Sequence, residues 1–123
     1  MHVNVFDFSE LLARSPRRYS EFLRVSSLSV GIYVLERGER DPQKPHTEDE
    51  VYYIASGRAK MRMEADREVE TFDVRPGSII FVPARMRHAF YDITERLAVL
   101  VFFGPAQHSG AAGVAITSKG REG

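Results

Sequence analysis

Short runs of β-branched and aromatic residues, separated by residues that favour turns, recur along most of this 123-residue chain. Turn signals such as Ser56-Gly57 and Pro76-Gly77 end the runs, because proline presets the backbone of a turn and glycine tolerates it. Seven or eight short strands at this spacing are typical of an antiparallel sandwich or barrel, so an all-β fold is predicted. The predicted strands cover residues 29–35, 50–55, 58–64, 68–74, 79–82, 88–93 and 97–103.

The two ends of the chain follow other patterns. A short helix is predicted at 7–14, because Asp7 can accept hydrogen bonds from first-turn amides and Glu10 occupies the capping position. Residues 1–28 are interpreted as this helix and a lead-in strand, and residues 29–104 as the barrel with the single core that a chain of this length can build. Residues 105–123 are interpreted as a polar Gly- and Ala-rich tail, in which 113–117 could add an edge strand.

Composition narrows the classes of function. Seventeen basic and seventeen acidic residues cancel, so no nucleic-acid partner is expected. Cysteine is absent, which removes disulfides, thiolate metal sites and cysteine nucleophiles. No apolar stretch approaches the ~18 residues of a membrane span, and the N-terminus lacks the basic start and apolar run of a signal peptide. A cytoplasmic protein without a membrane partner is therefore expected.

A candidate metal site is indicated by two separate segments. His46, Glu48 and Glu50 are two residues apart, so in an extended chain they project from the same face. His88 lies on a distant predicted strand and can join them only if the sheet closes. Two histidines and one carboxylate would form a facial triad for Zn, Fe, Ni or Mn, with open positions for water, substrate or dioxygen. From the residues alone, the alternative is that each histidine is a hydrogen-bonded or surface residue and not a metal ligand.

The first of these segments resembles the first half of the cupin signature. Six residues separate Glu50 from Gly57, as in that signature, and His46 matches the second histidine of the family's His-x-His pair. Lys44 stands at the position of the first histidine, although an ammonium group is no ligand at neutral pH.

The second segment resembles the other half of the signature. Its proline and histidine are present as Pro83 and His88, while Arg85 stands where glycine is usual and Asp92 where asparagine is usual. The resemblance covers residues 30–103, most of the chain. It implies a cupin-type double-stranded β-helix, or jelly-roll, barrel with one divalent transition metal in its lumen.

The resemblance also implies a set of site residues. The metal ligands would be His46, Glu50 and His88, with Glu48 or Asp49 as alternative donors. A cupin without metal is the other interpretation, in which the two histidines form hydrogen bonds in a ligand pocket.

The implied activity is an enzyme acting on a small organic, possibly anionic, substrate in the barrel. Fe would support oxygenase chemistry, whereas Zn, Ni or Mn would support isomerisation, lyase or hydrolytic chemistry by Lewis-acid catalysis. Lys44 or Arg85 would position a substrate carboxylate, and Tyr52, which shares the inward parity of Glu50, would donate a proton or hydrogen bond. The alternatives are a non-catalytic binding or sensing module and a barrel simply packed with side chains.

The strand pattern also bears on assembly. Phe102 and Phe103 must fall on opposite faces of one strand, so one of them lies outside the barrel core. Cupins of this size commonly pair their sheets, so the resemblance implies a homodimer.

Overall fold

The computed structural model describes residues 5–15 and 18–107. The suggested edge strand at 113–117 lies outside these residues. The predicted N-terminal helix is present as α1 (Phe8–Ala13), and the Asp7 carboxylate accepts a hydrogen bond from the Glu10 amide at 3.0 Å. Among the described residues, no helix is long and apolar enough to cross a membrane.

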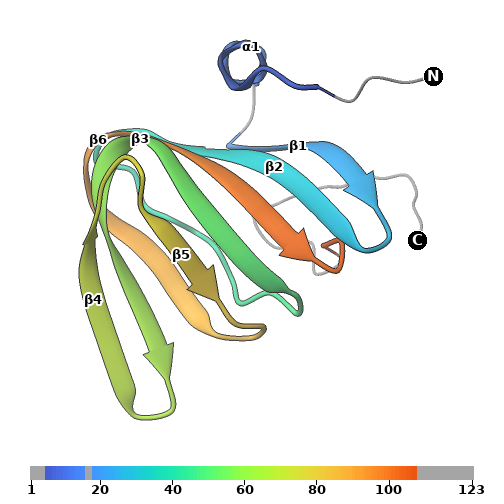
Figure 1. Ribbon diagram of the computed structural model, residues 1–123. Coiled ribbons are helices and arrows are strands. Elements are labelled where there is room, and N and C mark those ends of the chain that lie inside the picture. The colour runs from blue at the N-terminus through green and yellow to red at the C-terminus, as the bar shows by residue number, and fades with distance from the viewer. Residues whose placement is uncertain (1–4, 16–17, 108–123) are drawn as a thin grey trace.

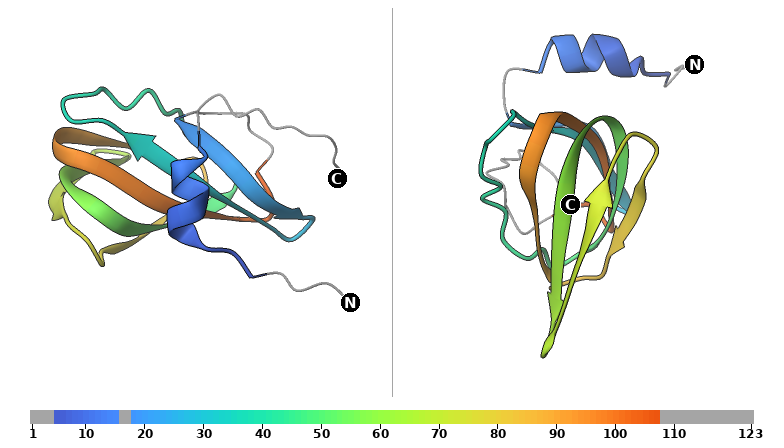
Figure 2. Two further views of the ribbon diagram at one scale, coloured as in Figure 1. Left: turned by 90° about the horizontal axis from the view of Figure 1, so that it is seen from above. Right: turned by 90° about the vertical axis from the view of Figure 1, so that its left-hand side faces the viewer.

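Six antiparallel strands follow the helix and form one continuous hydrogen-bonded sheet (Figure 1). The sheet order is β1-β2-β6-β3-β4, and β5 pairs with β3. The sheet curves so that its strands surround a central interior (Figure 2). The strands are β1 (Tyr19–Val25), β2 (Leu28–Leu35), β3 (Asp49–Ala65), β4 (Glu68–Val74), β5 (Ile79–Val82) and β6 (Arg87–Gly104).

The two longest strands each unite two strands that the sequence predicted separately. Within β3, register shifts on both sides of Ser56 interrupt the pairing with β6. Even-numbered residues up to Ile54 face inward, whereas from Ala59 onward the odd-numbered residues do so. Gly57 makes this bend with φ +97°, and a Cβ placed on it would lie 2.1 Å from the Arg96 carbonyl oxygen. The turn signal at Ser56-Gly57 therefore marks an irregularity inside one strand rather than the end of a strand.

The barrel core consists mainly of alternate side chains from β2, β3, β5 and β6, with Tyr19 from β1 and Val74 from β4. Tyr52, which was predicted to face inward with Glu50, and Phe90 are fully buried in this core. Phe103 also faces inward, whereas Phe102 on the opposite face is half-buried. Apolar packing thus fills the middle of the barrel, and polar side chains occupy the end where β3 begins.

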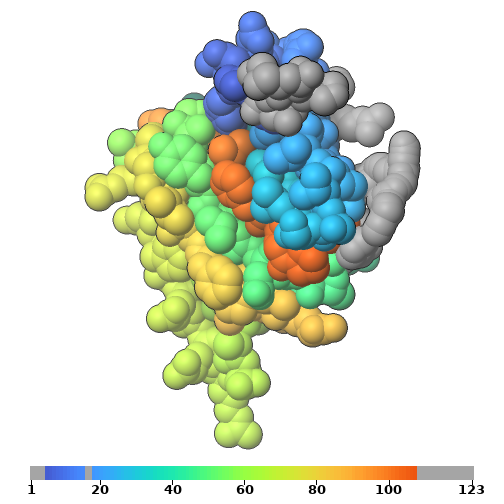
Figure 3. Space-filling model, turned by 45° about the vertical axis from the view of Figure 1, so that its right-hand side comes forward, coloured from blue at the N-terminus to red at the C-terminus, as the bar shows by residue number. Residues whose placement is uncertain are grey.

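The outer surface carries two further features. The β3–β4 hairpin projects beyond the body of the barrel (Figures 1 and 3). On the outside of the paired strands β3 and β5, Tyr53, Ile79 and Phe81 remain exposed, and Tyr53 lies directly opposite Ile79. These three side chains are called the outer patch below.

Candidate metal centre

Closure of the barrel brings together residues that are far apart in the β3–β6 ladder. Glu50, the second residue of β3, pairs with Phe103 near the end of β6, whereas His88 pairs with Met63 near the other end of β3. Glu50 also pairs with Val82 of β5, whose chain leads through a short turn into His88. The curved sheet therefore returns the start of β6 to the start of β3. His46, in the loop just before β3, completes the group.

The three side chains form a buried cluster of potential metal ligands. One ligand atom from each of His46, Glu50 and His88 can be chosen so that all lie within 4.8 Å of one another. Glu50 Oε1 is 3.4 Å from His88 Nε2 and 3.9 Å from His46 Nε2. Ligands at about 2.0–2.2 Å from a shared ion are separated by about 3–4 Å, so these distances suit a single metal.

The environment of Glu50 supports this fit. The residue is 2% exposed, and neither carboxylate oxygen has a hydrogen-bond partner among the described residues. Such a buried anion is costly unless a cation or a proton compensates its charge. A divalent metal between the two imidazoles would provide that compensation.

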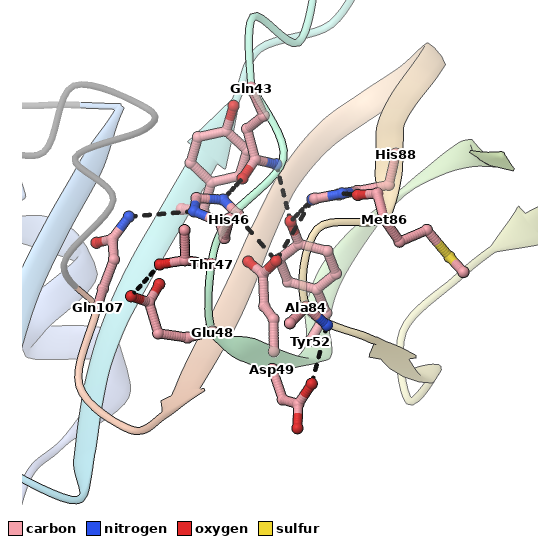
Figure 4. Close-up of polar contacts among 12 residues, drawn as sticks. Gln43, His46, Thr47, Glu48, Asp49, Tyr52, Ala84, Met86, His88 and Gln107 are labelled. Carbon is pink, nitrogen blue, oxygen red and sulfur yellow. Dashed lines mark hydrogen bonds and ion pairs between the residues drawn. The ribbon is translucent and has the colours of Figure 1, made fainter. Parts of the chain in front are cut away.

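Hydrogen bonds orient both imidazole rings (Figure 4). His88 Nδ1 lies 2.9 Å from the Met86 carbonyl oxygen and donates its proton there, which leaves Nε2 directed at Glu50. A backbone acceptor on the far ring nitrogen is the usual arrangement for a metal-binding histidine. The Tyr52 hydroxyl lies 3.0 Å from the same Nε2. His46 stacks edge-on against Phe103, with ring centroids 4.9 Å apart.

Burial and the charge of Glu50 set the protonation of the site. Burial lowers the pKa of His46 below its ordinary value near 6.5, and the charge of Glu50 opposes this only in part. Burial acts in the same direction on His88, but the close contact with Glu50 and its charge outweigh it, so the pKa of His88 is raised. Burial, together with Glu50, raises the pKa of Tyr52 well above the usual range, so this residue is a neutral phenol.

Three polar residues that were not predicted surround the cluster. The Gln43 side chain contacts both His46 and Tyr52. Asp41 is buried and accepts hydrogen bonds from the Tyr33 hydroxyl and from the Phe90 amide, the latter at 2.9 Å. The third, Gln107, places its side-chain amide 3.3 Å from His46 Nδ1. In the sequence, the only sign that Asp41 and Gln43 belong to the site is that they lie within the first signature segment.

A narrow recess leads to the cluster from the side of β1. It reaches His46 and Glu50 but is too narrow in this structure to hold a water molecule. Aromatic rings of Tyr19, Tyr33 and Phe103 form much of its lining. The Tyr19 hydroxyl is buried and has no hydrogen-bond partner among the described residues. A mostly apolar lining with a few polar groups is typical of sites for small organic molecules, but side chains would have to move to open this recess for one.

Comparison with known proteins identifies the family. The sequence profile of the Cupin domain matches residues 31–104, more than half of the chain. The chain belongs to the cupin family. Its predicted fold is confirmed, since the structure is similar to an RmlC-like cupin with a double-stranded β-helix fold from Methanocaldococcus jannaschii. That likeness has a TM-score of 0.64 and 19% identity and covers 85% of this chain and 93% of the other.

Two further proteins are similar to this cupin. An uncharacterized protein of Streptomyces coelicolor is 46% identical over 89 residues, which are 72% of this chain and 81% of the relative. An oxalate decarboxylase is similar in structure, with a TM-score of 0.61 and 28% identity. That match covers 68% of this chain but only 23% of the enzyme, so the chain spans less than a quarter of its length.

In this cupin, the residues that depart from the signature do not enter the cluster. The side chains of Lys44 and Arg85 are exposed. Arg85 has φ +67°, a left-handed backbone that explains the preference for glycine at this position, and its amide donates to the His46 carbonyl at 2.6 Å. From the loop that contains Lys44, the side chain that reaches the cluster is instead that of Gln43.

The alternative carboxylates also lie outside the group of three. Glu48 is buried, and its Oε2 accepts a hydrogen bond from the Thr47 hydroxyl at 2.6 Å. Asp49 is exposed and accepts a hydrogen bond from the Ala84 amide at 2.8 Å, which fixes the turn between β5 and β6 (Figure 4). Glu50 is thus the carboxylate that the fold brings to both histidines.

Proposed function

We propose that this cupin binds one divalent transition metal through His46, Glu50 and His88 and acts as an enzyme on a small organic substrate. The observation that carries the proposal is the buried Glu50 carboxylate, which lies between two imidazoles and lacks a hydrogen-bond partner among the described residues. Fe, Zn, Ni and Mn all accept this set of nitrogen and oxygen donors. When bound, such a metal would polarise a substrate oxygen or, in the case of Fe, support oxygen chemistry.

The protein's own residues would bind the substrate and control its protons. The recess beside His46 and Glu50 would accept the substrate after its side chains move apart, and its aromatic walls would exclude water from the apolar part. Tyr52, a neutral phenol 3.0 Å from His88 Nε2, would hold a proton at the edge of the metal centre. The exposed Lys44 and Arg85 would attract an anionic substrate from the solvent side. The similarity to an oxalate decarboxylase favours a small carboxylate as that substrate.

Metal analysis of protein purified without a nickel column tests the proposal. We expect about one metal ion per chain, before or after reconstitution. A content below about one tenth that also resists reconstitution would contradict it. Among variants, His88→Ala should lose the metal, whereas Glu48→Gln should retain it. The opposite result would show that Glu48, rather than the residues assigned here, completes the site.

A metal-free barrel that only binds a ligand is the second candidate. It is favoured by the contacts that both Nε2 atoms make with protein groups, Gln43 Oε1 at 3.0 Å from His46 and the Tyr52 hydroxyl at 3.0 Å from His88. The same metal measurement separates the two candidates. A protein that binds small carboxylates equally well with and without chelator would support this second function.

For the oligomeric state, we propose a homodimer that buries the outer patch. The three side chains of this patch are 40%, 72% and 56% exposed, in the order Tyr53, Ile79 and Phe81. Adjacent exposed apolar residues of this kind often mark a protein interface. Light scattering should give a dimer for the natural sequence and a monomer for Phe81→Lys. The control Val69→Lys, at an equally exposed position on β4, should remain dimeric.

A further inference from the structure

We propose that the side-chain oxygen of Gln43 is a fourth protein ligand of the metal. This inference rests on the proposed function, because it requires that a metal binds at His46, Glu50 and His88. Gln43 Oε1 lies 3.0 Å from His46 Nε2, the nitrogen that faces Glu50. Two ligands that occupy neighbouring positions at about 2.1 Å from one ion are about 3.0 Å apart. The two atoms therefore already have the separation of neighbouring ligands.

Hydrogen bonds fix which end of the Gln43 amide faces the cluster. Gln43 Nε2 lies 3.3 Å from Asp41 Oδ2 and 2.8 Å from the Tyr52 hydroxyl oxygen. Asp41 Oδ2 also accepts the Phe90 amide at 2.9 Å, so it acts as an acceptor here and the Gln43 amide nitrogen must point toward it. A flipped amide would place its carbonyl oxygen against this carboxylate. The amide oxygen, and not its nitrogen, is consequently directed at His46.

The loop holds Gln43 in this position before any metal binds. The Gln43 amide donates to Asp41 Oδ1 at 3.2 Å, and Asp41 itself is buried and fixed by the Tyr33 hydroxyl and the Phe90 amide. Because Gln43 Oε1 already lies beside His46 Nε2, binding requires His46 Nε2 to exchange its contact with Gln43 for a contact with the ion. Little reorganisation is then needed, which favours affinity.

The alternative is that Gln43 accepts a hydrogen bond from a metal-bound water. Affinity alone does not separate the two roles, because loss of an outer hydrogen bond also weakens metal binding about 10–100-fold. The number of water molecules on the ion does separate them. A lost protein ligand is replaced by about one water, whereas a lost outer contact leaves the number unchanged.

The test uses Mn(II) as the probe with the full chain and three variants. Binding is measured by titration, and the number of bound waters by water-proton relaxation of the Mn(II)-loaded protein. For Gln43→Ala we expect at least about tenfold weaker binding and about one additional water. Gln43→Glu keeps an oxygen donor on the side of His46, so it should retain the original water number; no gain in affinity is expected, because its second oxygen would face the Asp41 carboxylate. Lys44→Ala, next in the chain but exposed, should match the natural sequence in both measurements.

Each outcome has a distinct meaning. An unchanged water number in Gln43→Ala, or an increased water number in Gln43→Glu, would overturn the fourth-ligand role while leaving the three-residue site intact. Failure of the natural sequence and of Lys44→Ala to bind any metal would instead reject the proposed function. If Gln43→Ala does not fold by circular dichroism, the comparison of Gln43→Glu with the natural sequence still decides the question.

Discussion

Replacing Glu50 with glutamine keeps the shape of the side chain and removes its charge, so it separates metal binding from folding. In the metal-free protein at pH 9, the Glu50 carboxylate is buried without a hydrogen-bond partner among the described residues. An unsatisfied buried acceptor costs about 1–3 kcal/mol, and more when it is charged. The free energy of unfolding of metal-free Glu50→Gln should therefore exceed that of the natural sequence by about 1–3 kcal/mol.

Metal should make the natural sequence more stable than Glu50→Gln. An ion present at about 100 times its dissociation constant stabilises the natural sequence by about 2.7 kcal/mol. Glu50→Gln lacks the anionic ligand and should gain little stability from the metal. Urea unfolding followed by far-UV circular dichroism, in chelator and in excess metal, measures both differences.

The pH dependence provides an internal check on the same variant. The folded-state pKa of His88 is raised above its ordinary value near 6.5. Its pairing with Glu50 therefore contributes stability that is fully present below the unfolded pKa and is lost as pH rises through the folded pKa. The advantage of metal-free Glu50→Gln should accordingly shrink or reverse near pH 5.5.

The reasoning would be refuted if Glu50→Gln were the less stable protein in chelator at pH 9. It would also fail if metal stabilised both proteins equally. Glu70→Gln, at an exposed position on β4, is the control for loss of one negative charge and should change stability by less than about 0.5 kcal/mol in either condition.

Three further outcomes are expected. Metal affinity should fall as pH decreases through the raised pKa of His88, because a proton competes with the metal for Nε2. Chelator competition measures the affinity between pH 6 and 9, and an affinity that does not change with pH would contradict this prediction. Gly77→Ala should lower the free energy of unfolding by about 1–2 kcal/mol, because Gly77 has a left-handed backbone. Gly57→Ala should lower it by at least about 2 kcal/mol more, because its Cβ would also lie 2.1 Å from the Arg96 carbonyl oxygen. Equal losses of stability in urea unfolding would contradict the structure. Tyr19→Phe should leave stability in thermal unfolding unchanged or raise it by up to about 1 kcal/mol, since the lost hydroxyl has no hydrogen-bond partner among the described residues. A clear loss of stability would show that this hydroxyl does have a hydrogen-bond partner.

Alternation of apolar residues was sufficient to predict most of the barrel. The strands at 68–74 and 79–82 were predicted with the observed bounds, because turn residues flank each of them. The same signals overestimated the number of breaks, since Ser56-Gly57 bends β3 without ending it. A local sequence pattern cannot distinguish a bulge from a turn, because the difference depends on whether β6 continues to pair beyond the irregularity.

The candidate site could be predicted only where the chain is regular. Glu50 and Tyr52 follow the two-residue repeat of β3, so their shared inward direction was evident from spacing. Gln43 lies in the irregular segment before β3, where no repeat indicates which side chain faces inward. The alignment of the signature placed Lys44 at the missing histidine, yet the loop turns Lys44 outward and Gln43 toward His46. The role of Asp41, which orients Gln43, could not be predicted either, because its hydrogen-bond partners lie on strands elsewhere in the chain.

Arg85 shows a different limit of inference from residue type. Its charge predicted a substrate contact, whereas the structure reveals a separate role for its backbone: with φ +67°, the amide of Arg85 donates to the carbonyl of His46 at 2.6 Å. This bond ties the turn that precedes His88 to the loop that carries His46. A non-glycine residue in such a conformation stores about 1–2 kcal/mol of strain, which the hydrogen bond and the neighbouring β5–β6 turn must offset. The two ligand-bearing segments are therefore held at a fixed separation through main-chain atoms, whichever side chain stands at position 85.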